Sequence, residues 1–360
     1  MSFILGILTT LAILFLFGRI KLTSSGKTIL SKKLSSGPYI MAVGGGTGLS
    51  TLLRGIKTFT RNITAVVAVT DEGGSSGRIR NEWGMLPPGD VRNCIVALAE
   101  NDNELRSILD FRFDRGELSG HSLGNLLLLA VTEMCGDFST AVKKMNHLLS
   151  IRGRVLPVTT EGITLVGKTK NGESVRGELD ISHHGHELSE IGLEPEDAKP
   201  LHDVISAVDD AEIILLGPGS LFTSVIPNLL LPDFSAKIQS AQVPKVYICN
   251  LMTQPEETQG MNIVQHLDWV SAALDCVPDF VIANNEAIPD DIVEAYREQG
   301  ASPLYLDDSQ REIIRSMGCV CVEASIMSVY ESTKEGRVLR HDPQKLASVI
   351  FRLISEIYDD

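Results

Sequence analysis

The stretch Tyr39-Ile40-Met41-Ala42-Val43-Gly44-Gly45-Gly46-Thr47-Gly48 decides the fold of this chain. An unbroken apolar run is typical of a buried strand, and the glycines after it allow a tight turn into the next element. Residues 49–59 have apolar side chains at helical spacing, and residues 63–69 form a second apolar run. A strand, a glycine turn, a helix and another strand indicate a parallel sheet covered by helices.

The rest of the chain repeats this alternation. Further apolar runs that predict strands covered on both faces lie at 213–216, 245–249, 280–283 and 319–322. Helical spacing is found at 90–101, 122–134, 138–149, 202–209, 220–230, 260–274 and 344–358. The pattern predicts an α/β fold with a doubly wound, mostly parallel Rossmann-like sheet. Asn171-Gly172 is a hairpin signal and predicts a small antiparallel insertion at about 155–181, followed by an acidic loop at 186–203.

Composition and charge limit the function classes. The chain has 360 residues, 43% hydrophobic and 22% charged, as in ordinary globular proteins, and its net charge is −14. The first 70 residues hold eight basic residues and no acid, so the acidity lies in the body. An acidic body is a poor partner for nucleic acid, whose binding depends on phosphate neutralisation. Six cysteines without a CxxC pair indicate a reducing compartment and no zinc site.

The N-terminus differs from the body at 38–360. Residues 1–18 form an uncharged hydrophobic segment, with the apolar run at 3–17, and residues 19–37 form a basic polar linker. Because the basic residues follow the apolar run, the positive-inside rule places the body in the cytoplasm. We expect residues 3–33 to contact the membrane, so that the protein is attached to the inner face of the cytoplasmic membrane. A helix lying in the interface is one alternative to a spanning anchor, because the run is short for a bilayer, and a mispredicted start or a cleaved segment is the other.

The first glycine turn is a candidate anion site. Converging backbone N–H groups and the positive end of the following helix favour a phosphate at Gly44, Gly45, Gly46, Thr47 and Gly48. The turn is not the dinucleotide fingerprint, because Leu49 stands where the last glycine belongs, and it lacks the lysine of a P-loop. A tight connection without a ligand is the alternative.

A Gly/Ser-rich segment follows the second predicted strand. Asp71 at the strand's end suits ribose or sugar hydroxyls, or a divalent cation carried with a phosphate. We expect the segment to supply ligand contacts rather than a solvated turn, and the candidate anion donors are Gly73, Gly74, Ser75, Ser76 and Arg78.

Two polar pairs open the next helices. Asp90 suits either an N-cap or a ligand contact, and Asn93 lies three residues further along, so it can face the same crevice. His121 and Asn125 are four residues apart at the start of an apolar helix that Ser122 can cap. We expect ligand contact here, and a buried, hydrogen-bonded histidine is the alternative.

A second glycine turn lies at Gly217-Pro218-Gly219-Ser220, where Gly217, Gly219 and Ser220, at the N-cap, are candidate anion contacts. Asn250 ends the following strand and is a further candidate. Arg340 can reach an anionic ligand from a position just before the last helix, which Asp342 caps. His183, His184 and His186 form a small cluster in a polar stretch. Loop histidines without an Asp or Cys array nearby rarely form a metal site.

Six of these stretches together resemble the YvcK/CofD-like family. They lie at 44–48, 70–80, 86–93, 118–125, 217–228 and 247–254, and the resemblance covers about 38–350. The bacterial branch, the gluconeogenesis factors, is the closer match. It implies one nucleotide-ligand pocket, a ligand of the UDP-N-acetylglucosamine type, and regulation of peptidoglycan precursor metabolism and cell shape.

The resemblance also implies an alternative, because the other branch, the 2-phospho-L-lactate transferases, builds a deazaflavin coenzyme with a divalent cation. A Mg²⁺-dependent transferase acting on a nucleotide diphosphate donor, with Asp71 as candidate metal ligand, is therefore the second hypothesis. Asp71-Glu72 stands where the family usually has Asp-Asp, which weakens a two-carboxylate metal site. A dinucleotide-dependent oxidoreductase is the third. We expect a ligand-binding regulator without catalytic residues, a homo-oligomer, and a cell-wall precursor enzyme as candidate partner.

Overall fold

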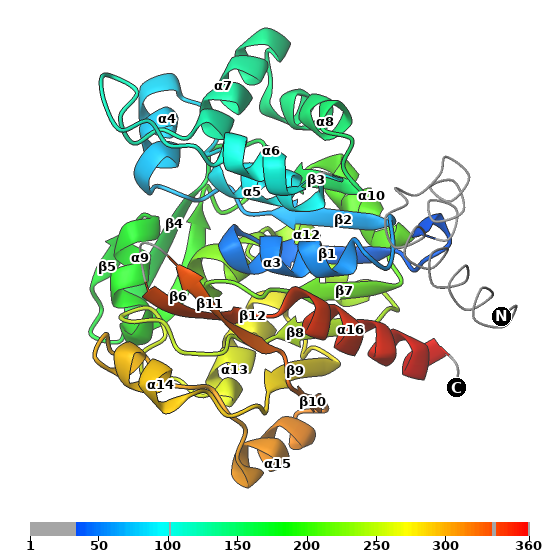
Figure 1. Ribbon diagram of the computed structural model, residues 1–360. Helices are drawn as coiled ribbons and strands as arrows, with labels where there is room; N and C mark the ends of the chain where they lie inside the picture. Colours follow the sequence, from blue (N-terminus) through cyan, green and yellow to red (C-terminus); the bar gives the residue numbers. More distant parts are fainter. Residues whose placement is uncertain (1–33, 101, 333–335, 359–360) are drawn as a thin grey trace, which may run out of the picture.

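The core of the protein is a seven-stranded sheet in the order β10-β9-β8-β7-β1-β2-β3, and every neighbouring pair is parallel. This computed structural model describes residues 34–100, 102–332 and 336–358 (Figure 1). The strands are β1 (Ile40–Gly44), β2 (Ile63–Val67), β3 (Arg154–Pro157), β7 (Ile213–Leu216), β8 (Lys245–Ile248), β9 (Phe280–Asn284) and β10 (Val320–Ala324). The predicted parallel α/β sheet is confirmed.

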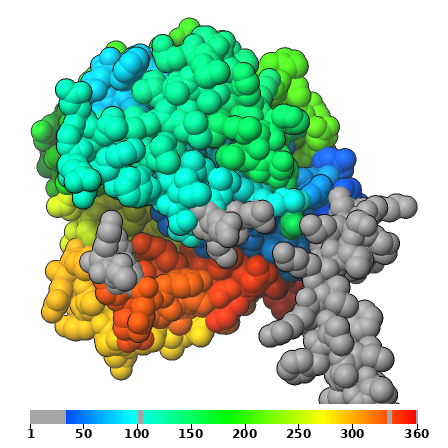
Figure 2. Space-filling model, turned by 45° about the horizontal axis from the view of Figure 1, so that its top comes forward, coloured from blue at the N-terminus to red at the C-terminus, as the bar shows by residue number. Residues whose placement is uncertain are grey.

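Helices cover both faces of this sheet (Figure 1). On one face α3 (Gly46–Ile56) packs between α5 (Gly89–Leu98) and α16 (Pro343–Tyr358). On the other, α12 (Pro232–Ser240) packs between α10 (His202–Asp210) and α13 (Ile263–Leu274). Chain segments far apart in sequence thus meet, and Figure 2 shows the red C-terminal segment and the cyan segment on opposite sides of the blue residues.

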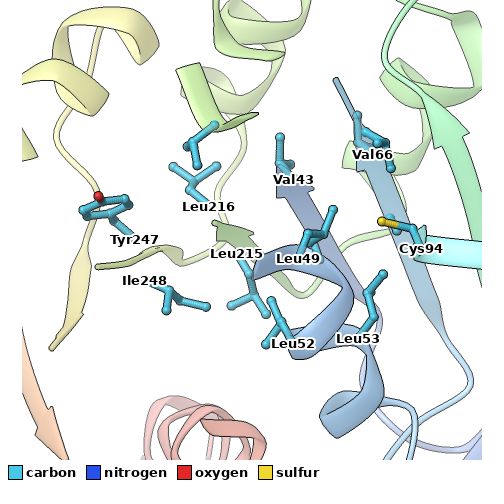
Figure 3. Packing of buried hydrophobic residues seen from close by; sticks show 14 of the residues in the cluster. Val43, Leu49, Leu52, Leu53, Val66, Cys94, Leu215, Leu216, Tyr247 and Ile248 are labelled. Carbon is cyan, nitrogen blue, oxygen red and sulfur yellow. The ribbon is translucent and has the colours of Figure 1, made fainter. Parts of the chain in front are cut away.

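The core forms because the strands are apolar on both faces. Leu49, Leu52 and Leu53 of α3 are fully buried, and Figure 3 shows Leu49 near Val43 and Leu52 near Leu215. On the other side of β1, Leu215 and Leu216 lie near Tyr247 and Ile248 (Figure 3). Each such side chain stabilises the fold by about 1.5–3 kcal/mol through burial, so the carboxyl ends of the strands are held in fixed positions.

The antiparallel insertion differs from its prediction at both ends. The hairpin at Asn171-Gly172 is confirmed, and it joins β4 (Thr164–Thr169) to β5 (Ser174–Arg176). Arg154–Pro157, however, is β3 of the large sheet, because its buried Val155 and Leu156 pair with β2. The expected acidic loop contains a third antiparallel strand, β6 (Leu188–Glu194), which buries Leu188 and Leu193.

Several elements were not predicted. The Gly/Ser-rich segment after β2 becomes helix α4 (Gly74–Trp83) rather than a flexible loop. A β-hairpin of β11 (Met327–Ser332) and β12 (Gly336–His341) precedes α16. The other unpredicted elements are α6 (Asp102–Leu109), α9 (Glu178–His184), the short helix Gly185–Glu187, α12 (Pro232–Ser240), α14 (Asp290–Arg297) and α15 (Asp308–Ser316).

The remaining predicted helices are present, as α7 (Leu123–Cys135), α8 (Phe138–Leu148), and a π-helical turn at Leu221–Val225 that leads into α11 (Ile226–Leu229). The hydrophobic N-terminal segment lies outside the described residues. Among the helices that the structure does describe, none is long and apolar enough to cross a bilayer.

Candidate functional site

A cavity of about 360 Å³ lies where β1, β7 and β8 end. Both predicted glycine turns line it, since Gly45, Gly46, Thr47 and Gly48 form one wall and Gly219 and Ser220 another. The other predicted residues in the lining are Asn250 and Arg340. Ligands of open α/β sheets bind at this edge, so the cavity is the candidate site.

The two glycine turns touch one another through their backbones. A Cβ atom at Gly48 would lie 2.3 Å from the carbonyl oxygen of Pro218 and 2.9 Å from the Cα of Gly219, which is far inside van der Waals contact. Gly46 has φ of +60° and Gly217 has φ of +82°, and side chains rarely adopt this backbone. Glycine is therefore required at Gly48 by close approach and at the other two positions by conformation.

A carboxyl group already lies behind the first turn. The Asp90 carboxylate accepts a hydrogen bond from the backbone N–H of Gly46, and burial, with the nearby charges of Asp71 and Glu178, raises the pKa of Asp90 to about 7. Asp90 is not the expected N-cap, because α5 begins at Gly89 after Pro88 and has no side-chain cap. Its carboxyl group instead approaches the turn that precedes α3.

A second carboxyl group, which sequence reasoning missed, lies behind the second turn. Glu257 is 1% exposed, and its Oε1 accepts a hydrogen bond of 2.9 Å from the backbone N–H of Phe222. Ser220 stands at the N-cap position but makes no side-chain cap. Burial raises the pKa of Glu257 to about 7. Its sequence context, a polar loop, carries no signal for this role.

The loop after β8 forms the wall beside the second turn. Asn250 Nδ2 donates to the Gly219 carbonyl at 2.9 Å, and Gln254 Nε2 donates to the Ser220 hydroxyl at 2.8 Å. Because a carbonyl can only accept, the amide orientation of Asn250 is fixed. Its Oδ1 is therefore the atom that can accept a hydrogen bond from a ligand.

Arg340 supplies positive charge at the rim of the cavity. It is the one lining side chain with a permanent positive charge among the residues that the structure describes. His341, also in the lining, is buried with its Nε2 3.2 Å from the Cys249 carbonyl, and burial lowers its pKa to about 4, so it is neutral at pH 7. Asp342 caps α16 as predicted, accepting from the backbone N–H groups of Gln344 and Lys345.

The other predicted residues form internal contacts outside this cavity. Ser75 Oγ lies 3.0 Å from His121 Nδ1 and accepts from Asn125 Nδ2 at 3.1 Å, so this pair joins α4 to α7, and Ser122 caps α7 as expected. Ser76 Oγ accepts from the Gly89 N–H at 3.1 Å, and Arg78 donates to the Ser119 carbonyl. The predicted residues outside the cavity lining are Gly44, Asp71, Gly73, Gly74, Ser75, Ser76, Arg78, Asp90, Asn93, His121, Asn125 and Gly217.

Asp71 and Asn93 have separate surroundings. Asp71 Oδ1 accepts from the Gly73 N–H at 2.9 Å, which forms the turn before α4. Asn93 lines a small cavity of about 60 Å³ with Arg54 and Arg106. Within residues 34–100, 102–332 and 336–358, no three His, Cys, Asp or Glu side chains are placed to bind a metal ion together.

Comparison with known proteins identifies the family. Residues 40–327 match the family described as 2-phospho-L-lactate transferase CofD. The chain belongs to the CofD family. It is 40% identical over 321 residues to a protein of Bacillus subtilis named gluconeogenesis factor, covering 89% of this chain and 99% of that protein. It is 41% identical over 313 residues to the protein of that name from Halalkalibacterium halodurans, covering 86% and 95%.

A solved structure has the same fold as this CofD-family chain. The crystal structure of a Bacillus halodurans protein described as a member of the UPF0052 family superposes with a TM-score of 0.82 at 40% identity, covering 88% of this chain and 99% of that chain. The resemblance inferred from the sequence motifs is confirmed at the level of family and fold.

Proposed function

We propose that this CofD-family protein is a gluconeogenesis factor that binds a nucleotide sugar of the UDP-N-acetylglucosamine type and regulates carbon flux into peptidoglycan precursors, with an effect on cell shape. One observation carries the proposal: two glycine turns and Arg340 line the same 360 Å³ cavity at the carboxyl edge of the sheet. Its volume is within the range of small-molecule sites. The names of the relatives support the regulatory role.

The lining suits the parts of such a ligand. The backbone of the first turn and the Arg340 guanidinium favour a diphosphate. Asn250 Oδ1 suits an N–H or O–H donor of a base or sugar. The apolar side chains of Leu251, Met252 and Leu339 can pack against a ring. The cavity therefore offers charge, a directional acceptor and an apolar surface in one place.

Binding without turnover is the favoured mode. None of the described lining residues is an Asp, Glu, Cys or Lys, so the cavity lacks the usual nucleophiles and general bases apart from hydroxyl groups and the neutral His341. A ligand that binds and leaves intact fits this set of residues. The regulator then acts through the occupancy of the cavity.

A Mg²⁺-dependent transferase is the second candidate, and the description of the matching family supports it. Mg²⁺ would arrive with a nucleotide diphosphate, and Asp71 would contact it. Asp71→Asn keeps the shape and removes the charge, so a metal role predicts weaker binding only when Mg²⁺ is present. Equal losses with and without Mg²⁺ would instead indicate contact with ligand hydroxyls.

Placement in the cell is part of the proposal. The apolar run at 3–17 and the basic residues after it support attachment to the inner face of the cytoplasmic membrane. We also propose that the protein is a homo-oligomer and contacts a cell-wall precursor enzyme. Crosslinking of the fractionated protein tests these two contacts. Full-length protein found in the soluble fraction at low salt would contradict the attachment.

Calorimetric titration tests the ligand. We expect UDP-N-acetylglucosamine to bind, and Arg340→Ala to weaken the Kd by about tenfold to a hundredfold, since a charge-assisted contact to phosphate contributes about 1.5–3 kcal/mol. Arg337→Ala is the matched control, because Arg337 is on the same strand but pairs with Asp291 and does not line the cavity. Equal affinity of the two variants would remove Arg340 from the site.

A further inference from the structure

Glu257 occupies the position where a helix N-terminus would otherwise receive an anion. Its carboxylate accepts from the backbone N–H groups of Phe222 and Thr223, in the first turn of the helical segment that follows the second glycine turn. Backbone N–H groups at the start of a helical segment are ordinarily suited to an anion. Since the chain's own carboxylate holds them, the second turn can contact a ligand only through other atoms.

The Ser220 hydroxyl is the atom that links Glu257 to the cavity. Ser220 lines the cavity, donates to the Glu257 carboxylate and accepts from Gln254 Nε2 at 2.8 Å. A hydroxyl has one proton and two lone pairs. With its proton on Glu257 and one lone pair on Gln254, Ser220 presents its second lone pair, which repels a phosphate oxygen.

Protonation of Glu257 reverses this arrangement. The neutral carboxylic acid still accepts from Phe222 N–H through its carbonyl oxygen, and its O–H donates to Ser220 Oγ. Ser220 then accepts from both Glu257 and Gln254, and its own hydrogen turns toward the cavity. One proton taken up from solvent thus converts the cavity wall from an acceptor to a donor.

We propose that Glu257 is a specificity-determining residue that sets the hydrogen-bond direction of Ser220, so that an anionic ligand binds together with one proton. This inference rests on the proposed function, since it concerns the same cavity. Glu257 does not touch the ligand, and acts through Ser220. The ligand class it selects is a phosphate whose oxygen needs a donor at this wall.

The surroundings of Glu257 favour this protonation. It is fully buried, and Glu178 of α9 adds a negative charge that raises its pKa further, to about 7. Tyr247 of β8 is the other titratable group facing it, and burial keeps that phenol protonated with its pKa well above 10. Among the described residues, no Lys or Arg forms an ion pair with Glu257. His183 and His186 contact the adjacent Glu256 instead.

The insertion holds this loop in place. A Cβ atom at Gly185 would lie 2.3 Å from the Glu257 carbonyl oxygen, so the short helix 185–187 packs directly on the backbone of the loop. The His186 N–H donates to the Glu256 carbonyl at 3.1 Å. The carboxyl group is therefore fixed by contacts on both sides, and its protonation acts on Ser220 rather than on a mobile loop.

Two substitutions distinguish this role from a structural one, because they move affinity in opposite directions. The side-chain amide introduced by Glu257→Gln donates to Ser220 as the protonated acid does. At pH 8 this variant should therefore bind UDP-N-acetylglucosamine about tenfold more tightly than the wild type does at the same pH. Its Kd at pH 8 should equal that of the wild type at pH 6. Ser220→Ala loses the donor and should bind at pH 6 as weakly as the wild type does at pH 8. The diphosphate diester has no titration between these values, so the ligand itself adds no pH dependence.

Proton uptake is measured by calorimetry at pH 7 in buffers of different ionisation enthalpy, with sulfate as a second, non-titrating anion. If the number of protons taken up on anion binding is smaller in Glu257→Gln and in Ser220→Ala than in the wild type, the proposal is supported. This result counts with either anion, even if the nucleotide sugar fails to bind. Nucleotide-sugar binding with equal uptake in all three proteins would overturn it and leave the proposed function standing. If neither anion binds, both proposals are wrong. If Glu257→Gln does not fold, Ser220→Ala and the infrared band of a protonated carboxyl group in the wild type decide: no band at pH 6 overturns the proposal.

Discussion

The two glycine turns differ in how a carboxyl group meets them. Behind the first turn, Asp90 is half-buried, accepts from Gly46 alone and lies beside two further acids. Behind the second, Glu257 is fully buried and is held by two backbone N–H groups and a hydroxyl. The pKa of each is raised to about 7. Turns that look alike in sequence thus offer different atoms to a ligand: backbone N–H groups at the first, and the Ser220 hydroxyl at the second.

The contact between the turns is the feature whose loss has the largest expected effect. Gly48→Ala places a Cβ atom 2.3 Å from the Pro218 carbonyl oxygen and 2.9 Å from the Gly219 Cα, and these backbone atoms leave it no space. We expect a loss of about 3 kcal/mol in the free energy of unfolding, together with loss of ligand binding, because the turns must separate.

Urea unfolding and calorimetric titration measure the two effects. Gly162→Ala is the matched control, since a Cβ atom there meets nothing within 4 Å, and it should change stability by less than about 0.5 kcal/mol. A Gly48→Ala protein as stable as this control would show that the two turns are not in contact.

The second prediction uses pH to separate the second turn from the rest of the protein. Because the folded pKa of Glu257 lies above the ordinary value of 4.5, the folded protein binds a proton that the unfolded chain releases. Its contribution to stability is complete below pH 4.5 and is lost as the pH rises through 7. Relative to Glu257→Gln, the free energy of unfolding of the wild type should fall by about 2 kcal/mol between pH 5 and pH 7. One titrating group can change this free energy by at most about 1.4 kcal/mol per pH unit.

Urea midpoints of the two proteins across this range give the difference directly. The sign is the informative part: a wild type that gains stability over Glu257→Gln as the pH rises would mean that the carboxylate is stabilised in its ionised form. The electrostatic account of the second turn would then be wrong.

The sequence made the large sheet predictable because its strands are covered on both faces and are therefore apolar without interruption. Strand β3 was missed because it has only four residues, begins with Arg154, and adjoins the alternating pattern of the insertion. Strand β6 was missed because its solvent side is acidic and Gly192 interrupts the alternation. A strand that is short, or that is buried on one face only, has a weak sequence pattern. It is identified by the strand with which it pairs, and the sequence does not show that pairing.

The site follows the same rule. Glycine turns and polar residues at strand ends are local patterns, so the sequence predicted Gly45 to Gly48, Ser220 and Asn250, and the structure brings these residues to one cavity. The roles of Asp90 and Glu257 depend on tertiary placement, since Glu257 reaches a backbone N–H 35 residues away. His121 precedes helix α7 and so does not share a helical face with Asn125, but both side chains contact Ser75 and neither lines the cavity.

The third prediction tests the contact behind the first turn with a double-mutant cycle. A Cβ atom at Gly45 would lie 2.5 Å from Asp90 Oδ2, which is the end of a side chain that can move. We expect Gly45→Ala to cost about 1–2 kcal/mol in stability, and less than half of that when Asp90→Ala is also present. At the second turn, a Cβ atom at Gly219 meets Ser224 rather than Glu257, so Gly219→Ala and Glu257→Ala should be additive. Additivity at both turns would show that Asp90 does not lie behind Gly45.

The smallest effect concerns an ion pair beside the loop that supports the second turn. His183 of α9 pairs with Glu256, the neighbour of Glu257, but both side chains are more than half exposed. Exposed ion pairs contribute about 0.2–1 kcal/mol, so His183→Ala should lower the free energy of unfolding by about 0.5 kcal/mol or less. His184→Ala is the control, because His184 contacts only the Asp180 carbonyl of its own helix among the described hydrogen bonds. If the insertion positions Glu257 through this loop, His183→Ala should also weaken ligand binding about twofold while His184→Ala leaves the Kd unchanged. Equal Kd values for both variants, measured by titration at pH 7, would restrict the positioning of Glu257 to the backbone contacts at Gly185 and His186.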